Sequence, residues 1–275
     1  PGPWNDNDMA YQSTQLASWI VVNAGFACLA PRVIIQHASW PGRRPLLERV
    51  GNRLAKTETR MAYYPGAAER HALFLEDHPQ ARLYGSPSPR HLPWTLIADV
   101  DPTDSENICF KREAFCGLLC ETALEAPDVP AFIDRAVQFA NNTLWGTLCA
   151  TLIVHPQSLR DPKIAEAVER AISDLRYGTV SINAFTFYSA YFMSAPWGAY
   201  PGHDMFDIQS GIGKTFNFLM IEGVQKSVIR APFKRIDPLT VVSRHPHIFA
   251  QKLAHFEYDP AWRRLPALLW TAVRC

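Results

Sequence analysis

The feature that most constrains the fold of this chain is a regular alternation of short apolar runs with longer amphipathic segments. The runs that predict buried strands are residues 32–36, 95–100, 115–124, 147–155, 179–183 and 226–231. The segments that predict helices are residues 9–22, 44–55, 67–75, 129–140, 162–175, 246–255 and 261–273. Strands and helices that alternate at these lengths are typical of a parallel sheet covered by crossover helices. The sequence therefore predicts an α/β fold, with three α/β/α layers and a mainly parallel sheet.

Local signals refine this prediction at the ends of the elements. Asp6 or Asn7 is expected to cap the first helix, and Asn23 with Gly25 is expected to end it. The proline-rich residues 77–93 predict a surface loop. The aromatic-rich stretch that follows the strand at residues 179–183 is expected to be a loop that lines a site.

The charge balance excludes several classes of partner. The chain has 27 basic and 26 acidic side chains, a net charge of +1, so no basic excess is available to neutralise phosphates. A content of 48% hydrophobic and 19% charged residues excludes wholesale disorder. The apolar runs fall short of the ~20 residues that a spanning helix needs, and the first residues do not resemble a secretion signal. We expect no nucleic acid partner, no membrane and a cytoplasmic location.

The six cysteines are irregularly spaced in a chain long enough to fold without disulfides, so free thiols are expected. Cys116 and Cys120 are interpreted as apolar strand residues and not as metal ligands. Cys28 differs because it lies where the first helix gives way to the first strand. Backbone N–H groups at such a junction can favour a thiolate and hold an oxyanion. Cys28 is therefore the candidate nucleophile, and a small buried packing residue is its alternative.

The segment around Cys28 resembles a known family. Residues 23–32, Asn-Ala-Gly-Phe-Ala-Cys-Leu-Ala-Pro-Arg, are similar to the active-site segment of the aldehyde dehydrogenase superfamily. Further segments resemble that family in the same order: residues 112–115 (Arg-Glu-Ala-Phe), 139–146, 178–183 (Gly-Thr-Val-Ser-Ile-Asn), 196–200 and 210–213. This collinear resemblance extends over residues 5–231.

The resemblance implies an activity and roles for particular residues. It implies oxidation of a small-molecule aldehyde to a carboxylic acid through a cysteine thiohemiacetal and thioester, with NAD or NADP as the cofactor. Cys28 would be the nucleophile, Glu113 would contact the nicotinamide ribose, and Phe115 would pack near the nicotinamide. The residues expected to line the substrate side are Asn23, Asn183, Phe185 and Trp197. Water is the expected acyl acceptor, and coenzyme A is the alternative.

Several of these assignments have a structural alternative. Asn183 can instead be a polar cap at a strand end, and Glu113 an exposed charge before a strand. The aromatic residues that could line an aldehyde tunnel can equally be core residues; they are Phe185, Tyr188, Tyr191, Phe192 and Trp197.

The chain also departs from the family pattern. Phe26 stands where the family usually has Gln, and Cys116-Gly117 stands where it has Gly-Pro, which puts the backbone next to Glu113 in question. The family's dinucleotide-binding domain, its oxyanion-hole Asn and its general-base Glu are not found. We therefore expect a catalytic domain (residues 1–236) with a helical extension (237–275), taken from a larger homo-oligomeric enzyme and inactive alone.

Other functions remain open from the sequence. A non-catalytic scaffold or oligomerisation module could use the same fold. The reactivity of Cys28 distinguishes this hypothesis from the enzyme hypothesis. A Cys28 hydrolase would need a base such as His37, His71 or His155, which need only be adjacent in space. His245 and His247 lack a nearby carboxylate or thiol and are not expected to bind a metal.

Overall fold

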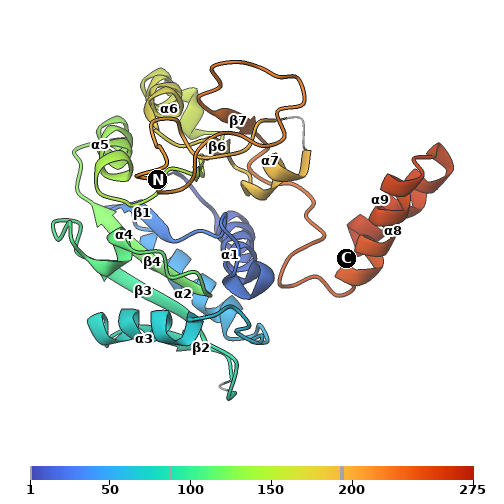
Figure 1. Ribbon diagram of the computed structural model, residues 1–275, viewed down its shortest axis with the longest axis horizontal. Coiled ribbons are helices and arrows are strands. Elements are labelled where there is room, and N and C mark those ends of the chain that lie inside the picture. Colours follow the sequence, from blue (N-terminus) through green and yellow to red (C-terminus); the bar gives the residue numbers. More distant parts are fainter. Residues whose placement is uncertain (1, 87, 193–194) are drawn as a thin grey trace.

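The computed structural model describes residues 2–86, 88–192 and 195–275 and has helices on both sides of two β-sheets (Figure 1). The first half contains α1 (Asp6–Val21), a 3-10 turn (Val22–Gly25), β1 (Val33–His37), α2 (Arg43–Leu54), α3 (Ala67–Asp77), β2 (Arg82–Tyr84), β3 (Trp94–Val100), α4 (Ile108–Lys111), β4 (Leu118–Leu124) and α5 (Val129–Asn142). The second half contains β5 (Cys149–Leu152), a 3-10 turn (Ser158–Arg160), α6 (Pro162–Asp174), β6 (Thr179–Ile182), α7 (Phe187–Phe192), β7 (Ser227–Arg230), α8 (Pro246–Tyr258), a 3-10 turn (Trp262–Arg264) and α9 (Leu265–Arg274).

The strands form a four-stranded sheet in the order β1-β4-β3-β2 and a three-stranded sheet in the order β5-β6-β7. All neighbouring strands are parallel except β2, which runs antiparallel to β3 at the edge. Val33 pairs with Cys120 in the first sheet, and Cys149 pairs with Thr179 in the second. The predicted α/β class is thus confirmed, with one difference: the sheet is divided between β1 and β5.

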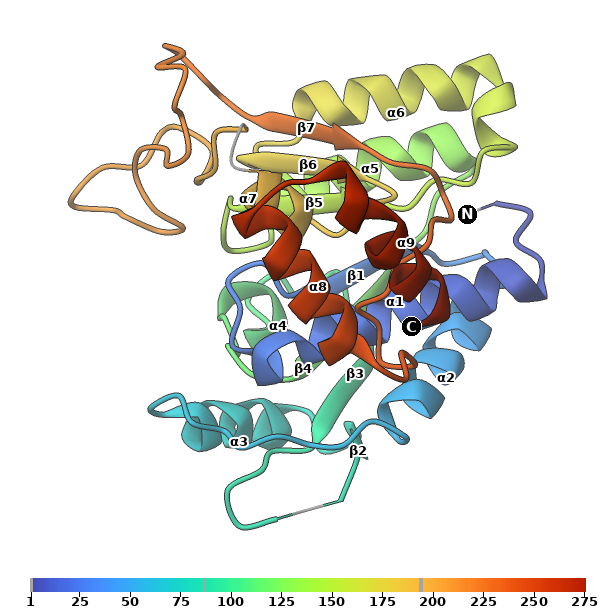
Figure 2. The ribbon, with the colours of Figure 1, turned by 90° about the vertical axis from the view of Figure 1, so that its right-hand side faces the viewer.

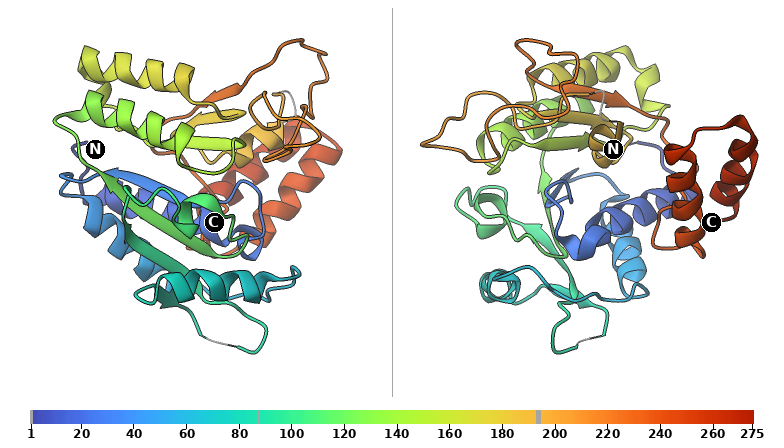
Figure 3. Two further views of the ribbon diagram at one scale, coloured as in Figure 1. Left: turned by 60° about the vertical axis from the view of Figure 1, so that its left-hand side comes forward. Right: turned by 45° about the vertical axis from the view of Figure 1, so that its right-hand side comes forward.

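Two helical layers cover the sheets. On one face α5 packs beside α6 and contacts β1 and β4 (Figure 3). On the other face α1 packs against α2, and their apolar side chains form a core with Leu96 and Leu119 of the sheet. Both layers bury apolar side chains, because helices that cross between parallel strands must place one apolar stripe on the sheet.

The strands and helices expected from the apolar pattern are found within a few residues of their predicted bounds, and several details of the prediction are wrong. Asn5, and not Asp6 or Asn7, caps α1, because its side chain accepts from the Asp8 N–H while Asp8 accepts from the Asn5 N–H. The expected loop at 77–93 contains β2, and the aromatic stretch contains α7. The strand predicted over 115–124 begins only at Leu118, because Phe115 has a left-handed backbone (φ 44°).

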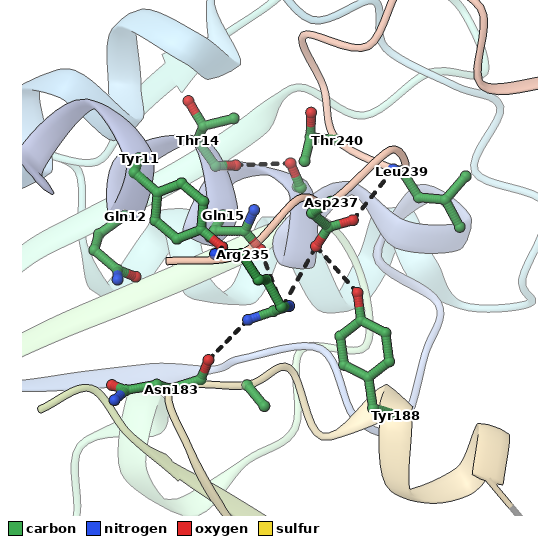
Figure 4. A network of polar contacts seen from close by, with 12 residues as sticks. Tyr11, Gln12, Thr14, Gln15, Asn183, Tyr188, Arg235, Asp237, Leu239 and Thr240 are labelled. Atoms are coloured by element: carbon green, nitrogen blue, oxygen red, sulfur yellow. Dashed lines mark hydrogen bonds and ion pairs between the residues drawn. The ribbon is translucent and has the colours of Figure 1, made fainter. Parts of the chain in front are cut away.

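A buried polar network fastens the segment after β7 along α1 (Figure 4). The Arg235 guanidinium donates to the carbonyl oxygen of Asn183 (2.8 Å) and forms an ion pair with Asp237 (3.4 Å). The Tyr188 hydroxyl donates to the same Asp237 carboxylate (3.1 Å). These contacts join β6, α7 and the C-terminal segment, so residues 235–237 are part of the packed body of the molecule.

Beyond that network, α8 and α9 pack against each other as a hairpin on the side of α1, apart from the two sheets (Figure 2). Leu268 is the buried side chain of this hairpin, whereas Tyr258, Trp262 and Trp270 are exposed. The hairpin therefore contributes little to the main core.

Candidate active site

The turn that carries Cys28 is built from three successive left-handed residues at the end of α1. Asn23 (φ 49°), Ala24 (φ 58°) and Gly25 (φ 83°) reverse the chain before it enters β1. A Cβ on Gly25 would lie 2.3 Å from the Gly117 nitrogen, so only glycine permits this close approach. Gly25 thus places the Cys28 turn directly against the segment that follows Glu113.

Arg32 joins the Cys28 turn to the segment that contains Glu113 and Cys116. Its guanidinium donates to the carbonyl oxygen of Cys116 (2.9 Å) and more weakly to those of Gly25 and Ala27 (3.4 and 3.5 Å). It also forms an ion pair with Glu113 at 3.5 Å. One arginine side chain therefore fixes both the turn before β1 and the carboxylate opposite it.

Cys28 is an exposed free thiol that lines the end of a cavity of about 420 Å³. Arg112, Glu113, Trp145 and Gly146 line the same cavity. Partial burial raises the pKa of the Cys28 thiol, and the negative charge of Glu113 raises it further. The backbone N–H of Cys28, the positive charge of Arg32 and the N–H of Leu29 lower that pKa in part. The sulfur is thus reachable and faces N–H donors, and its pKa remains above the ordinary value of a thiol.

Phe115 lies in an aromatic cluster next to the Cys28 turn. Its ring centroid is 6.1 Å from that of Phe26 and 4.8 Å from that of Tyr64, and the Arg32 guanidinium lies over its face. Tyr63 completes the cluster by an edge contact with Phe26. The structure therefore brings Phe115 to the segment of Cys28, although Phe115 does not line the cavity.

Asn23 and Asn183 are both engaged in local hydrogen bonds. The Asn23 amide nitrogen donates to the Phe26 carbonyl oxygen (2.9 Å) and to the Tyr63 hydroxyl (2.8 Å). The Asn183 side chain accepts from the Val154 N–H (2.7 Å) and donates to the Val154 carbonyl oxygen (3.0 Å). Neither residue lines the cavity that Cys28 lines. The side chain of Asn183 thus bonds to the backbone that follows β5, as a polar strand-end cap would.

The aromatic residues expected to line the substrate side have different environments. Phe185 lines the cavity but is buried, with its ring stacked on Trp19 at 5.2 Å. Trp197 pairs with Thr215 through two backbone hydrogen bonds and does not line the cavity. The side chains of Tyr191 and Phe192 lie outside the described residues. Among the expected lining residues whose side chains the structure describes, only Phe185 reaches the cavity.

The histidines considered as bases have other polar partners. His37 contacts the Ser39 hydroxyl (2.9 Å), and His71 contacts the Thr95 hydroxyl (2.8 Å). The His155 Nε2 atom lies 3.5 Å from a carboxylate oxygen of Asp8. Within the described parts of the chain, no group of three or more His, Cys, Asp or Glu side chains is placed to hold a metal ion.

Two residues of the site, one bonded to the Cys28 turn and one lining the cavity, were not identified as functional from the sequence. Arg32 reads as an ordinary charge before a strand, and its ion pair with Glu113 joins positions that are far apart in the chain. Trp145, which lines the cavity and is 45% exposed, lies in the segment 139–146 but was assigned no role. An arginine directly before an apolar strand was the one signal available, since charged residues are seldom buried without a partner.

Comparison with solved structures identifies the fold. The chain is similar to an NAD-dependent aldehyde dehydrogenase from Sinorhizobium meliloti (TM-score 0.59, 19% identity) over 76% of this chain and 39% of that one. It is similar to a betaine aldehyde dehydrogenase from Staphylococcus aureus in complex with NAD+ (TM-score 0.58, 19% identity, 76% and 40% of the chains). A putative aldehyde dehydrogenase from Burkholderia cenocepacia gives a TM-score of 0.57 at 21% identity, with 78% and 43% of the chains covered.

The molecule is therefore an α/β protein whose candidate site residues lie at the junction between α1 and β1. Its fold is that of the aldehyde dehydrogenases, and the chain spans about two fifths of the length of the structures it matches. No protein-family model matches the chain, and no curated protein matches it by sequence. In the described residues, no helix is long and apolar enough to cross a membrane.

Proposed function

We propose that this chain is the cysteine-bearing catalytic domain of an NAD(P)-dependent aldehyde dehydrogenase, with Cys28 as its nucleophile. The observation that carries the proposal is the exposed Cys28 sulfur at the end of a cavity, opposite Glu113 and close to the backbone N–H groups of Cys28 and Leu29. A thiol in this setting can attack a carbonyl carbon while an N–H group donates a hydrogen bond to the carbonyl oxygen, on which negative charge develops.

The Cys28 thiolate forms a carbon–sulfur bond to the aldehyde carbon, and the carbonyl electron pair moves to the oxygen. A bound NAD(P)+ would supply the hydride acceptor that converts this thiohemiacetal to a thioester. Water then attacks the thioester carbon, the carbon–sulfur bond breaks, Cys28 leaves as a thiolate, and the carboxylic acid that forms releases its proton to solvent.

The residues next to Cys28 fit one end of the cofactor. The Glu113 side chain is 36% exposed at the end of the cavity, and its carboxylate can accept hydrogen bonds from ribose hydroxyls. Phe115 is half-buried on the same segment and offers an apolar ring beside the Cys28 turn. Glu113 and Phe115 are therefore the residues that would hold the nicotinamide riboside end.

Further parts of the proposal concern the whole protein. We propose residues 1–236 as the catalytic domain and 237–275 as a helical extension, supported by the mostly exposed α8–α9 hairpin. A small-molecule aldehyde as the substrate, a homo-oligomeric state and a cytoplasmic location are predictions of the same proposal.

A non-catalytic scaffold is the second candidate, and a specific observation favours it. The pKa of Cys28 is raised by burial, which disfavours the thiolate, and the side chain of Asn23 is used up in contacts with Phe26 and Tyr63. In a scaffold, Cys28 would have no chemical role and would serve only as a packing residue of the turn between α1 and β1.

Aldehyde-dependent formation of NADH or NADPH by the full-length protein separates the two candidates. With aliphatic and aromatic aldehydes, we expect Cys28→Ser to lower the rate by at least about 10³-fold, and the matched variant Cys275→Ser to keep it. An unchanged rate in Cys28→Ser, or no reduction of either cofactor by the wild type, contradicts the enzyme proposal. If added coenzyme A changes the product from the carboxylic acid to acyl-coenzyme A, then coenzyme A, and not water, is the acyl acceptor.

A further inference from the structure

The α8–α9 hairpin contains a second cleft, which is separate from the cavity that Cys28 lines. Its volume is about 410 Å³. The residues that line it come from α8 and from the turn into α9; they are Gln251, Lys252, His255, Arg263, Arg264 and Ala267. The hairpin lies on the outside of the molecule, beside α1 (Figures 1 and 2). Four of the six lining side chains can carry a positive charge, and none of them is acidic.

One of these cations, Arg264, stabilises the turn of the hairpin. Its guanidinium donates to the carbonyl oxygens of His255 (3.0 Å) and Asp259 (2.8 Å), and it forms an ion pair with the Asp259 carboxylate at 2.8 Å. Both carbonyl groups lie at the carboxyl end of α8, where a cationic side chain is favourable. The charge of Arg264 is therefore compensated by Asp259, and this side chain has a structural role.

The charges of Lys252 and Arg263 are not compensated in this way. Among the residues that the structure describes, neither side chain forms an ion pair or a hydrogen bond. Residues 238–275 contain five Arg and Lys side chains but only two carboxylates, Glu257 and Asp259. Neither carboxylate lines the cleft. The cleft therefore carries a local excess of positive charge, although the net charge of the chain is only +1.

The kinds of side chain in the cleft select the chemistry of a ligand. The Arg263 guanidinium presents parallel N–H donors that match the oxygens of a phosphate, and the Lys252 ammonium adds a point charge. The Gln251 amide and the His255 imidazole can each donate a further hydrogen bond. The volume of the cleft lies within the range of small-molecule sites. These donors and charges fit an oxyanion with several acceptor oxygens better than they fit an apolar ligand.

We propose that the cleft between α8 and α9 binds a phosphate-bearing anion. Arg263 and Lys252 are the charged contacts of the phosphate oxygens, and Gln251 and His255 are additional donors. The cleft lies beyond residues 5–231, over which the sequence resembles a known family, so that resemblance implies nothing about it. The inference is independent of the catalytic proposal for Cys28.

Two sources offer this chemistry: a soluble diphosphate and the headgroup of an anionic phospholipid. Tyr258 and Trp262, which are close in sequence to the lining residues, are 92% and 88% exposed. Exposed Tyr and Trp side chains beside basic residues are typical of surfaces that meet a lipid headgroup region. A lipid source would correct the expectation, drawn from the sequence, that the chain has no membrane partner.

Isothermal titration calorimetry of the 275-residue chain with inorganic pyrophosphate tests the proposal. We expect saturable binding that weakens as salt is added, because salt screens the contacts between charges. Arg263→Gln and Lys252→Gln should each weaken binding by about tenfold or more. The matched control Arg274→Gln removes the same charge from the same hairpin outside the cleft, where the guanidinium lies 4.2 Å from the centroid of the Trp270 ring. This control should keep the affinity of the wild type.

Cosedimentation with phospholipid vesicles distinguishes the two sources. Binding to phosphatidylcholine vesicles that contain phosphatidylglycerol, lost in Arg263→Gln and reversed by pyrophosphate, would assign the cleft to a lipid headgroup. Pyrophosphate binding without such vesicle binding would assign it to a soluble diphosphate.

Three results would overturn the proposal. The first is the absence of saturable pyrophosphate binding at millimolar concentrations. The second is pyrophosphate binding that neither Arg263→Gln nor Lys252→Gln weakens. The third is an equal loss of affinity in Arg274→Gln, which would mean that the overall charge of the hairpin, and not the cleft, attracts the anion.

Discussion

Cys28 combines an exposed sulfur with surroundings that act on its ionisation in opposite directions. Burial and Glu113 raise the pKa of the thiol, while the backbone N–H groups and Arg32 lower it. Because Glu113 both opposes the thiolate and pairs with Arg32, this carboxylate controls the charge balance at the end of the cavity.

Replacing that carboxylate gives a prediction with a definite sign. A negative charge near a thiol disfavours the thiolate, so Glu113→Gln should lower the pKa of Cys28. The rate of Cys28 alkylation by iodoacetamide, followed against pH, should shift to lower pH and rise about two- to threefold at pH 8. Glu106→Gln, which removes an exposed partner of Lys111, is the control and should leave the profile unchanged. A shift to higher pH would contradict this reading of the site.

The close contact of Gly25 with Gly117 gives a second prediction at this scale. Gly25→Ala should lower the free energy of unfolding by about 3 kcal/mol or more, because a methyl group meets backbone and φ is positive. Gly213→Ala is a matched control with a similar φ (77°) but open space around it, and should cost about 1 kcal/mol. Urea unfolding of both variants measures the difference, and equal losses would show that the contact contributes nothing.

Among the structural elements, the first sheet is tied to α2 by a buried ion pair. Glu121 on β4 is completely buried, and both of its oxygens accept from Arg43, at 2.7 and 2.9 Å. The same carboxylate accepts from the Asp99 N–H (3.1 Å), where the backbone of β3 turns left-handed. Helix α2 is thus fixed to β3 and β4 by one charge.

Removing the arginine of this pair should leave a buried charge without compensation. We expect Arg43→Ala to lower the free energy of unfolding by about 3–5 kcal/mol. The neighbouring Arg44→Ala removes an exposed contact with Asp99 and should cost at most about 1 kcal/mol. Denaturant unfolding of the two variants is the measurement, and similar values would show that Arg43 contributes no more than a surface ion pair.

Elements with strong local patterns could be predicted from the sequence, and elements that depend on distant pairing could not. The helix of residues 162–174 has an apolar stripe and an Asp161 cap, so its bounds follow from local signals. β2 has three residues, none of them buried, and exists only because it pairs with β3. The division of the sheet between β1 and β5 could not be predicted for the same reason, since nothing in the sequence of either strand shows which edge stays unpaired.

The candidate site follows the same rule. Cys28, Glu113 and Phe115 could be found from short segments, and the structure brings them to one end of the cavity or beside it. Their positions depend on Arg32 and Gly25, which act through contacts with residues 116–117, more than 80 positions away. Asn23 and Asn183 also make hydrogen bonds with residues distant in the chain, Tyr63 and Val154, which no local pattern shows.

At the scale of the whole molecule, the chain has an aldehyde dehydrogenase fold and covers about 40% of the solved structures it matches. The cavity between the sheets, the exposed α8–α9 hairpin and the exposed apolar side chains of Phe206 and Met220 all present surface that a globular protein usually covers.

Peptide mapping after brief treatment of the folded chain with iodoacetamide tests most directly whether Cys28 is presented for reaction. Cys28 should carry the label well before Cys109, Cys116 and Cys120, which are buried, and burial raises the pKa of the Cys116 thiol to about 11. All of these cysteines should be labelled together once the chain is unfolded in urea. A Cys28 that stays unlabelled until the chain unfolds would contradict the account.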